Sequence, residues 1–186
     1  MSEGTAAELA RLRQIEAEEW AALDNLKAEC VARVADGMAA EVDAYAKKIA
    51  NAHPEQAKAL GKEGVSALRR ELAEVTAELA DQLRGAVDEI EWPEPKQYGK
   101  LDSSAVHSAL FKFLYGARVD RLTRVLKAHG FPFEPTAGVL PQDLYDRSSF
   151  GDLAEALQNI GRIQQEVAQA KIVDDRDTVD SLWEEQ

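Results

Sequence analysis

The chain has 186 residues, of which 45% are hydrophobic and 30% are charged, and its formal net charge is −12. This composition is too apolar for a disordered chain, and the length allows one folded domain without a metal or disulfide to hold it together. The acidic balance disfavours general nucleic-acid binding, and no apolar run reaches the roughly 18 residues that a membrane-spanning helix needs. We therefore expect a soluble, acidic globular protein without a membrane span.

The cysteine content and the N-terminal sequence indicate the cellular compartment. Cys30 is the one cysteine, so no internal disulfide is expected. The first residues lead into an alternately charged stretch, which is not the pattern of a secretory signal peptide. Both observations predict a reducing, cytoplasmic setting.

The first helix is predicted over about residues 5–50. Thr5 and Glu8 have the spacing of a capping box, in which a hydroxyl and a carboxylate satisfy backbone N–H groups at a helix start. No proline interrupts the chain before Pro54, and a helix of this length would extend for about 65–70 Å. Apolar residues recur through it at the spacing of one helical face: Leu9, Leu12, Trp20, Leu23, Leu26, Cys30, Val34, Met38, Val42, Tyr45 and Ile49.

A helix this long needs a partner helix along its length. The second helix, predicted over about residues 64–91, supplies one, because its apolar residues step by three and four, close to a heptad. His53 and Pro54 break the chain between the two, and residues 55–61 are predicted as a possible short helix. The product is a long antiparallel helical hairpin, coiled-coil-like, over residues 1–92. Since the second helix is shorter, one end of the first must meet the rest of the chain or another molecule.

Residues 93–186 are predicted as a C-terminal helical region that packs on the hairpin or extends from it. A third helix begins near Asp102 or Ser103, which are good N-caps, and runs to His129, where Gly130 stops it. A proline-rich apolar loop follows and is expected to pack down on helices. A fourth helix begins at Ser149, and the acidic tail around residues 174–183 is predicted as a short C-terminal helix. The predicted fold class is therefore all-α.

Polar residues intrude on the apolar stripe of the first helix. Glu16, Glu19 and Lys27 occupy positions that continue the stripe. In a coiled-coil seam such residues lower stability but fix the register and the partner. This pattern favours self-association or binding to a protein partner through a candidate helix interface, unless the third and fourth helices cover the same stripe. The candidate interface residues are Leu9, Leu12, Glu16, Trp20, Leu23 and Lys27.

A basic segment interrupts the acidic chain. Residues 96–130 carry 7 bases and 2 acids, whereas residues 1–95 carry 11 bases and 20 acids. At about 100° per residue, Arg118 falls in the middle of the apolar sector of the third helix and Arg121 falls inside its edge. Arg124 and Lys127 fall outside the sector. Arg118 is thus expected to form an internal ion pair, to contact an anion or partner, or to be plainly exposed.

Motifs for catalysis, cofactors and metals are missing from the sequence. The three histidines have no carboxylate or cysteine at metal-ligand spacing, and neither a dinucleotide fingerprint nor a P-loop occurs. We therefore predict no metal, no cofactor and no enzymatic activity. The expected function is a non-enzymatic helical interaction or assembly (adaptor) protein that self-associates. The alternative is a regulator that binds nucleic acid or a phosphorylated ligand through the basic helix 104–129, using Arg118, Arg121, Arg124 and Lys127.

Overall fold

The computed structural model describes residues 2–132 and 148–184. Four α-helices and one 3-10 turn account for the secondary structure of these residues, and they include no strand. The all-α fold class predicted from the sequence is confirmed. The elements are α1 (Ser2–Ala52), α2 (Pro54–Gly85), η1 (Val87–Glu89), α3 (Ser103–Ala128) and α4 (Ser148–Glu184).

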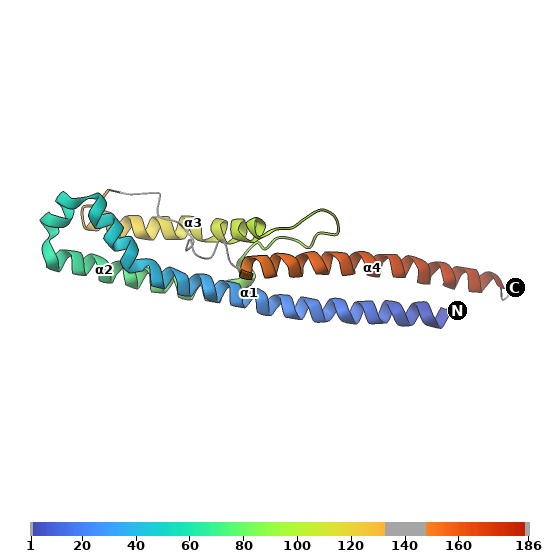
Figure 1. The fold of residues 1–186 in the computed structure, drawn as a ribbon. Coiled ribbons are helices and arrows are strands. Elements are labelled where there is room, and N and C mark those ends of the chain that lie inside the picture. Colours follow the sequence, from blue (N-terminus) through green and yellow to red (C-terminus); the bar gives the residue numbers. More distant parts are fainter. Residues whose placement is uncertain (1, 133–147, 185–186) are drawn as a thin grey trace.

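Helices α1 and α2 form an antiparallel hairpin, in which the chain reverses direction between His53 and Gly61 (Figure 1). His53 leaves the helical conformation, with φ −128° and ψ 66°, because the ring of Pro54 disfavours the α conformation in the residue before it. Pro54 then occupies the first turn of α2, where its missing N–H costs nothing. The short helix predicted over residues 55–61 is present as the first part of α2, and the non-helical backbone of Gly61, with φ 67° and ψ −176°, separates it from the rest of α2.

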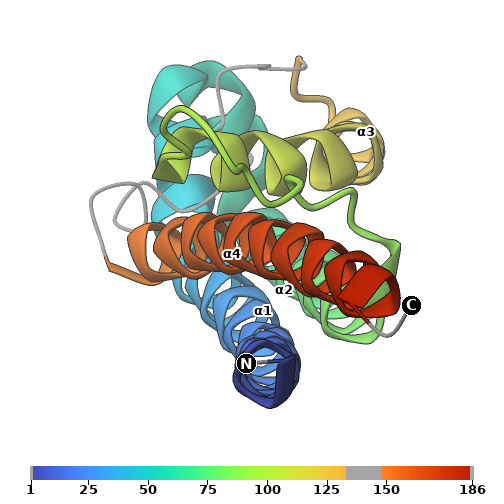
Figure 2. The ribbon, with the colours of Figure 1, turned by 90° about the vertical axis from the view of Figure 1, so that its right-hand side faces the viewer.

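The first half of α1 runs beyond the hairpin and is accompanied by α4, which lies antiparallel to it (Figures 1 and 2). We call this two-helix extension, residues 2–20 of α1 with residues 163–184 of α4, the arm. Near its end the Thr5 hydroxyl donates a hydrogen bond to Asp177 Oδ2 at 3.2 Å. Helix α1 is therefore covered by two successive partners, α2 along its second half and α4 along its first.

Three expected helix boundaries differ from the structure. Helix α1 begins at Ser2, so the predicted capping box at Thr5 is wrong, and the Thr5 hydroxyl instead reaches across to α4. Helix α2 ends at Gly85, and residues up to Glu91 form η1 and a turn. The tail predicted as a separate short helix continues α4, because neither glycine nor proline occurs after Gly161 and α1 runs alongside.

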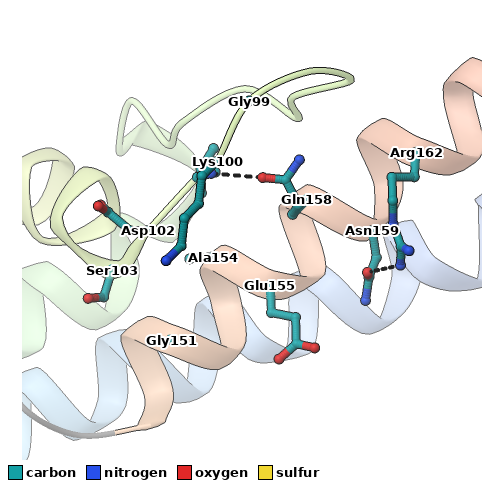
Figure 3. A pocket seen from close by; sticks show the side chains of 11 residues that line it. Gly99, Lys100, Asp102, Ser103, Gly151, Ala154, Glu155, Gln158, Asn159 and Arg162 are labelled. Atoms are coloured by element: carbon teal, nitrogen blue, oxygen red, sulfur yellow. Dashed lines mark hydrogen bonds between the residues drawn. The ribbon is translucent and has the colours of Figure 1, made fainter.

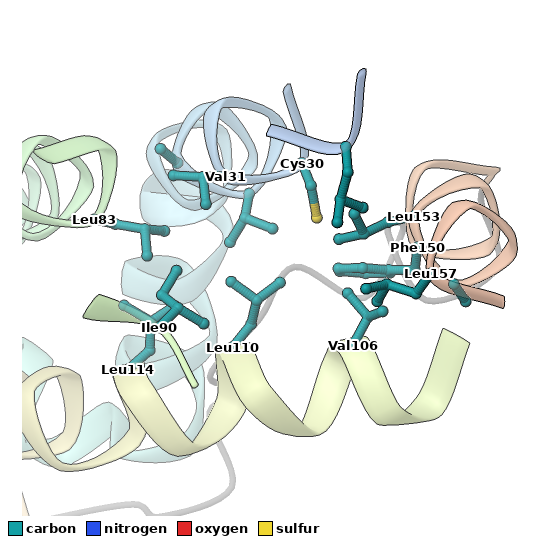
Figure 4. Close-up of a cluster of buried hydrophobic side chains, with 14 of the residues drawn as sticks. Cys30, Val31, Leu83, Ile90, Val106, Leu110, Leu114, Phe150, Leu153 and Leu157 are labelled. Atoms are coloured by element: carbon teal, nitrogen blue, oxygen red, sulfur yellow. The ribbon is translucent and has the colours of Figure 1, made fainter. Parts of the chain in front are cut away.

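The core divides into two clusters of buried side chains. The larger one gathers all four helices around α3 residues such as Leu110 and α4 residues such as Phe150 (Figure 4). The smaller one lies nearer the hairpin turn, where α1, α2 and the end of α3 meet Phe131. Phe131 belongs to the loop that was predicted to pack down, and it is buried; residues 133–147 of that loop lie outside the described residues.

Helix α3 begins and ends as its sequence predicts. The Asp102 carboxylate accepts a hydrogen bond from the backbone N–H of Ser104 at 3.0 Å, which caps the N-terminus. At the other end Gly130 has φ 78°, the left-handed conformation that glycine adopts most easily. These caps fix the span of the basic helix at Ser103–Ala128.

The segment between η1 and α3 is held against the outer side of α4, the side away from α1. Gln158 on α4 accepts from the backbone N–H of Leu101 at 2.7 Å and donates to the carbonyl of Lys96 at 3.0 Å. One turn further on, the Lys96 carbonyl oxygen lies 2.1 Å from the place where a Cβ at Gly161 would stand. The Gln165 amide donates to the Tyr98 hydroxyl at 3.3 Å.

We predict that Gly161→Ala destabilises the fold, because the new methyl group would overlap the Lys96 backbone. Overpacking of this kind costs roughly 1–3 kcal/mol in free energy of unfolding. Gly116→Ala on α3 is the matched control: nothing lies within 4 Å of its Cβ position, so it should raise stability by about 0.5–1 kcal/mol. Urea denaturation followed by circular dichroism measures both, and equal shifts would contradict the close approach at Gly161.

Candidate functional site

The basic residues of α3 occupy three different environments. Arg118 is buried, with 5% of its surface exposed, between the two core clusters. Arg121 donates to Glu78 of α2 at 3.2 Å and to Gln82 at 3.4 Å. Arg124 and Lys127 are exposed. The order of burial is the one that the helical-wheel positions predict.

Acidic residues of the hairpin neutralise part of the basic segment. Besides the pair between Arg121 and Glu78, Lys112 forms an ion pair with Glu91. The neighbouring lysine and the hydrogen bond it donates hold the pKa of the Glu91 carboxyl below its ordinary value. Of the four basic candidates, Arg124 and Lys127 are thus the two left on the surface, and neither forms an ion pair within the described part of the chain.

The candidate interface of α1 lies on the side of the helix that packs within the chain. Leu9 and Leu23 are buried, and Leu23 belongs to the cluster that contains Phe150 and Leu157 of α4. Lys27 keeps only 17% of its side chain exposed and reaches the Asp24 carboxylate at 3.3 Å. The half-buried members are Leu12, Glu16, Trp20 and Lys27. These residues therefore serve an interface between α1 and the rest of its own chain.

A different apolar surface is left open on the arm, on the far side of α4. Ile172, Val179 and Trp183 are exposed by 68%, 51% and 73%. Their spacings of seven and eleven residues place them within about 40° of one another on a helix. We call this surface, together with Arg176 between them, the outer face; Leu182 and Val173, also exposed, flank it.

The opposite side of α4 packs on α1. Asp174 and Asp177 on that side are half-buried, and Asp177 accepts the hydrogen bond from Thr5. The arrangement reverses the usual one, in which apolar residues of a helix face its neighbour and polar residues face water. The sequence signal for the outer face was the apolar spacing within the acidic tail, but nothing in it indicated which side α1 would take.

A cleft with a volume of about 680 Å³ lies between the start of α3 and α4 (Figure 3). Lys100 and Arg162 line it together with Asp102 and Glu155, so its charges are mixed. Hydrogen bonds from Ser104 lower the pKa of the Asp102 carboxyl, as expected for a helix cap. Gln158 at the cleft forms hydrogen bonds with the backbone of Leu101 and Lys96, and Arg162 donates a hydrogen bond to Asn159. Three polar side chains of this cleft, Asp102, Gln158 and Arg162, thus make contacts within the chain.

The remaining titratable groups of interest are internal. Burial raises the pKa of the Cys30 thiol to about 12, which strongly disfavours the reactive thiolate. Burial lowers the pKa of His107, whose ring packs edge-on against Phe150. Within residues 2–132 and 148–184, no three His, Cys, Asp or Glu side chains converge as metal ligands would. In the same residues no helix is long and apolar enough to cross a membrane.

A comparison with protein-family models found no match, and searches of curated proteins and of solved structures found none either.

Arg118→Ala is predicted to destabilise the fold strongly. The substitution removes a long buried side chain together with the polar contacts of its guanidinium. This loss should lower the free energy of unfolding by about 2–5 kcal/mol. Arg124→Ala, on the exposed side of the same helix, should change the free energy of unfolding by no more than about 0.5 kcal/mol. Arg118→Lys keeps the charge but loses the planar fork, so it should rescue stability only in part. Thermal and urea unfolding of the three variants provide the test, and equal small shifts would mean that Arg118 contributes little to the core.

Cys30 is predicted to resist alkylation in the folded protein. Its thiol is buried and its pKa of about 12 leaves almost no thiolate at pH 8. Labelling with iodoacetamide should therefore be limited by unfolding, and should become fast when denaturant is added. Mass spectrometry over time measures this, and rapid modification without denaturant would show that α4 uncovers this part of α1 in the native state.

Proposed function

We propose that this chain is a non-enzymatic interaction or assembly protein that acts by docking helices, copies of itself included, on the outer face of α4. The observation that carries the proposal is the exposure of Ile172, Val179 and Trp183 along one line of a helix whose other side is already packed. Scattered exposed apolar residues are normal on any protein, but a line of them at helical spacing is the pattern of a helix-binding surface.

The size of the outer face suits reversible docking. Fully burying a large apolar side chain contributes about 1.5–3 kcal/mol, so burying the exposed parts of Ile172, Val179, Leu182 and Trp183 contributes on the order of 4–8 kcal/mol. Association itself costs roughly 4–15 kcal/mol because the two molecules lose translational and rotational freedom. The gain from burial and the cost of association are comparable, which favours a reversible interaction over a permanent one. The outer face lies on one continuous helix, so docking requires no segment to fold first.

The second candidate is a regulator that binds nucleic acid or a phosphorylated ligand through residues 104–129. Its support is the exposure of Arg124 and Lys127 next to each other on the last turns of α3. This candidate has fewer available cations than the sequence suggests. Arg121 and Lys112 form ion pairs with acids of the same chain, and Arg118 is buried. Binding of this kind should weaken steeply as salt is raised.

We expect Val179→Asp to disrupt the assembly that this chain forms in extracts of its native host. A carboxylate in the middle of the outer face would have to be desolvated on docking, at a cost of several kcal/mol. Tyr115→Asp is the matched control, since Tyr115 is an exposed apolar side chain of similar exposure on α3, 43% against 51%. The measurement is the elution volume of a tagged chain in size-exclusion chromatography.

Wild type and Tyr115→Asp should elute together and earlier than Val179→Asp, and nuclease treatment should change none of the three. Co-elution of all three species would contradict docking on the outer face. An assembly that nuclease or moderate salt dissolves would instead favour the basic helix as the binding element.

A further inference from the structure

We infer that the partner of the outer face is the same face of a second copy, with the two α4 helices antiparallel and related by a two-fold axis near Thr178. The inference rests on the proposed function and names its partner. It follows from three features of α4: where the outer face begins, how its residues are spaced, and where its charges lie.

The outer face begins where the segment 96–101 stops covering α4. Gln158, Gly161 and Gln165 lie on the same side of α4 as Ile172 and Trp183, at helical spacing, and the segment 96–101 covers them. The hydrogen bond at Gln165 is the last one between this segment and the described part of α4, and the segment lies over the first part of α4 only (Figure 1). From Ile172 to Trp183 the bare surface continues for about 17 Å at 1.5 Å per residue. A straight helix laid along it would not meet the segment 96–101.

The spacing of the outer face is self-complementary. Ile172, Arg176, Val179 and Trp183 step by four, three and four residues, which is the alternation of core positions in a heptad. In an antiparallel pair with this register, Ile172 of each copy lies level with Trp183 of the other. Val179 of each copy lies level with Arg176 of the other and packs on its aliphatic stem. An isologous two-fold interface requires this kind of match of a surface with itself.

The charges select the antiparallel orientation. Arg176 lies at a core position of the outer face and Asp180 lies at its edge; both are exposed, and neither forms an ion pair within residues described in the structure. Antiparallel pairing brings Arg176 of each copy level with Asp180 of the other, which gives two opposite-charge contacts. Parallel pairing would instead bring Arg176 of one copy beside Arg176 of the other at the core of the interface. A polar residue at a core position is a recognised determinant of helix orientation and register.

The interface is small. A contact over the 12 residues from Ile172 to Trp183 of each copy falls in the class that buries less than roughly 1,200 Å², which is typical of transient complexes. The dimer should therefore dissociate in the micromolar range or above, and association must be measured on the purified full chain at concentrations of about 10–500 μM.

A charge-swap experiment tests the register. In Arg176→Asp both cross-pairs become acid against acid, and in Asp180→Arg both become base against base. Each variant alone should self-associate about tenfold more weakly than wild type. An equimolar mixture of the two should form a heterodimer nearly as tight as the wild-type dimer, because every pair across the interface is again of opposite charge. Sedimentation equilibrium measures all of these.

The matched controls are Arg70→Asp and Glu74→Arg on α2. They form an exposed pair four residues apart, at 4.0 Å, and their substitution makes the same changes in net charge far from the outer face. They should associate like wild type, alone and mixed. Circular dichroism melts of all four variants confirm that each one is folded.

Three outcomes would overturn the inference. They are a wild-type chain that stays monomeric at about 500 μM, single variants that associate as tightly as wild type, and a mixture that does not recover. If the purified chain is monomeric while Val179→Asp still changes elution in host extracts, the helix-docking function stands and its partner is another protein. If neither effect is seen, the outer face is not a docking surface.

Discussion

The structure depends on covering one apolar stripe that runs the whole length of α1. A 51-residue helix in water gains most of its stability from packing, because isolated helices are only marginally stable. No single element of this chain is as long as α1, so two helices share it, α2 on the half near the hairpin turn and α4 on the other half. Helix α3 then closes the hairpin side, where it completes both core clusters.

Much of this arrangement could be predicted from the sequence, because the relevant signals are local. Pro54 fixes the hairpin turn through the steric demands of its ring, and Asp102 and Gly130 set the ends of α3 through backbone hydrogen bonds and a left-handed conformation. Arg118 could be placed in the apolar sector of α3, where the structure buries it, since its angular position follows from helix geometry alone. In each case a few neighbouring residues determine the outcome.

The pairing of α1 with α4 could not be predicted in the same way. Periodicity shows that one face of a helix is apolar, but it does not show which element packs on that face. The stripe through Leu9 and Leu23 was therefore equally compatible with a partner molecule and with α4. The outer face of α4 went unrecognised for the same reason: Ile172 and Trp183 signal an apolar line, and only the position of α1 shows that this line points to solvent. Thr5 was mistaken for a helix cap because a hydroxyl near a helix start has the same local pattern whether it caps or reaches a neighbouring helix.

The continuity of α1 has a mechanical consequence. One unbroken helix, about 75 Å long at 1.5 Å per residue, passes from the hairpin turn to the end of the arm, and no proline interrupts it. The arm and the hairpin are therefore joined by continuous helical backbone and not by a loop. The distance between the hairpin turn and the end of the arm is therefore set by the rise of this one helix.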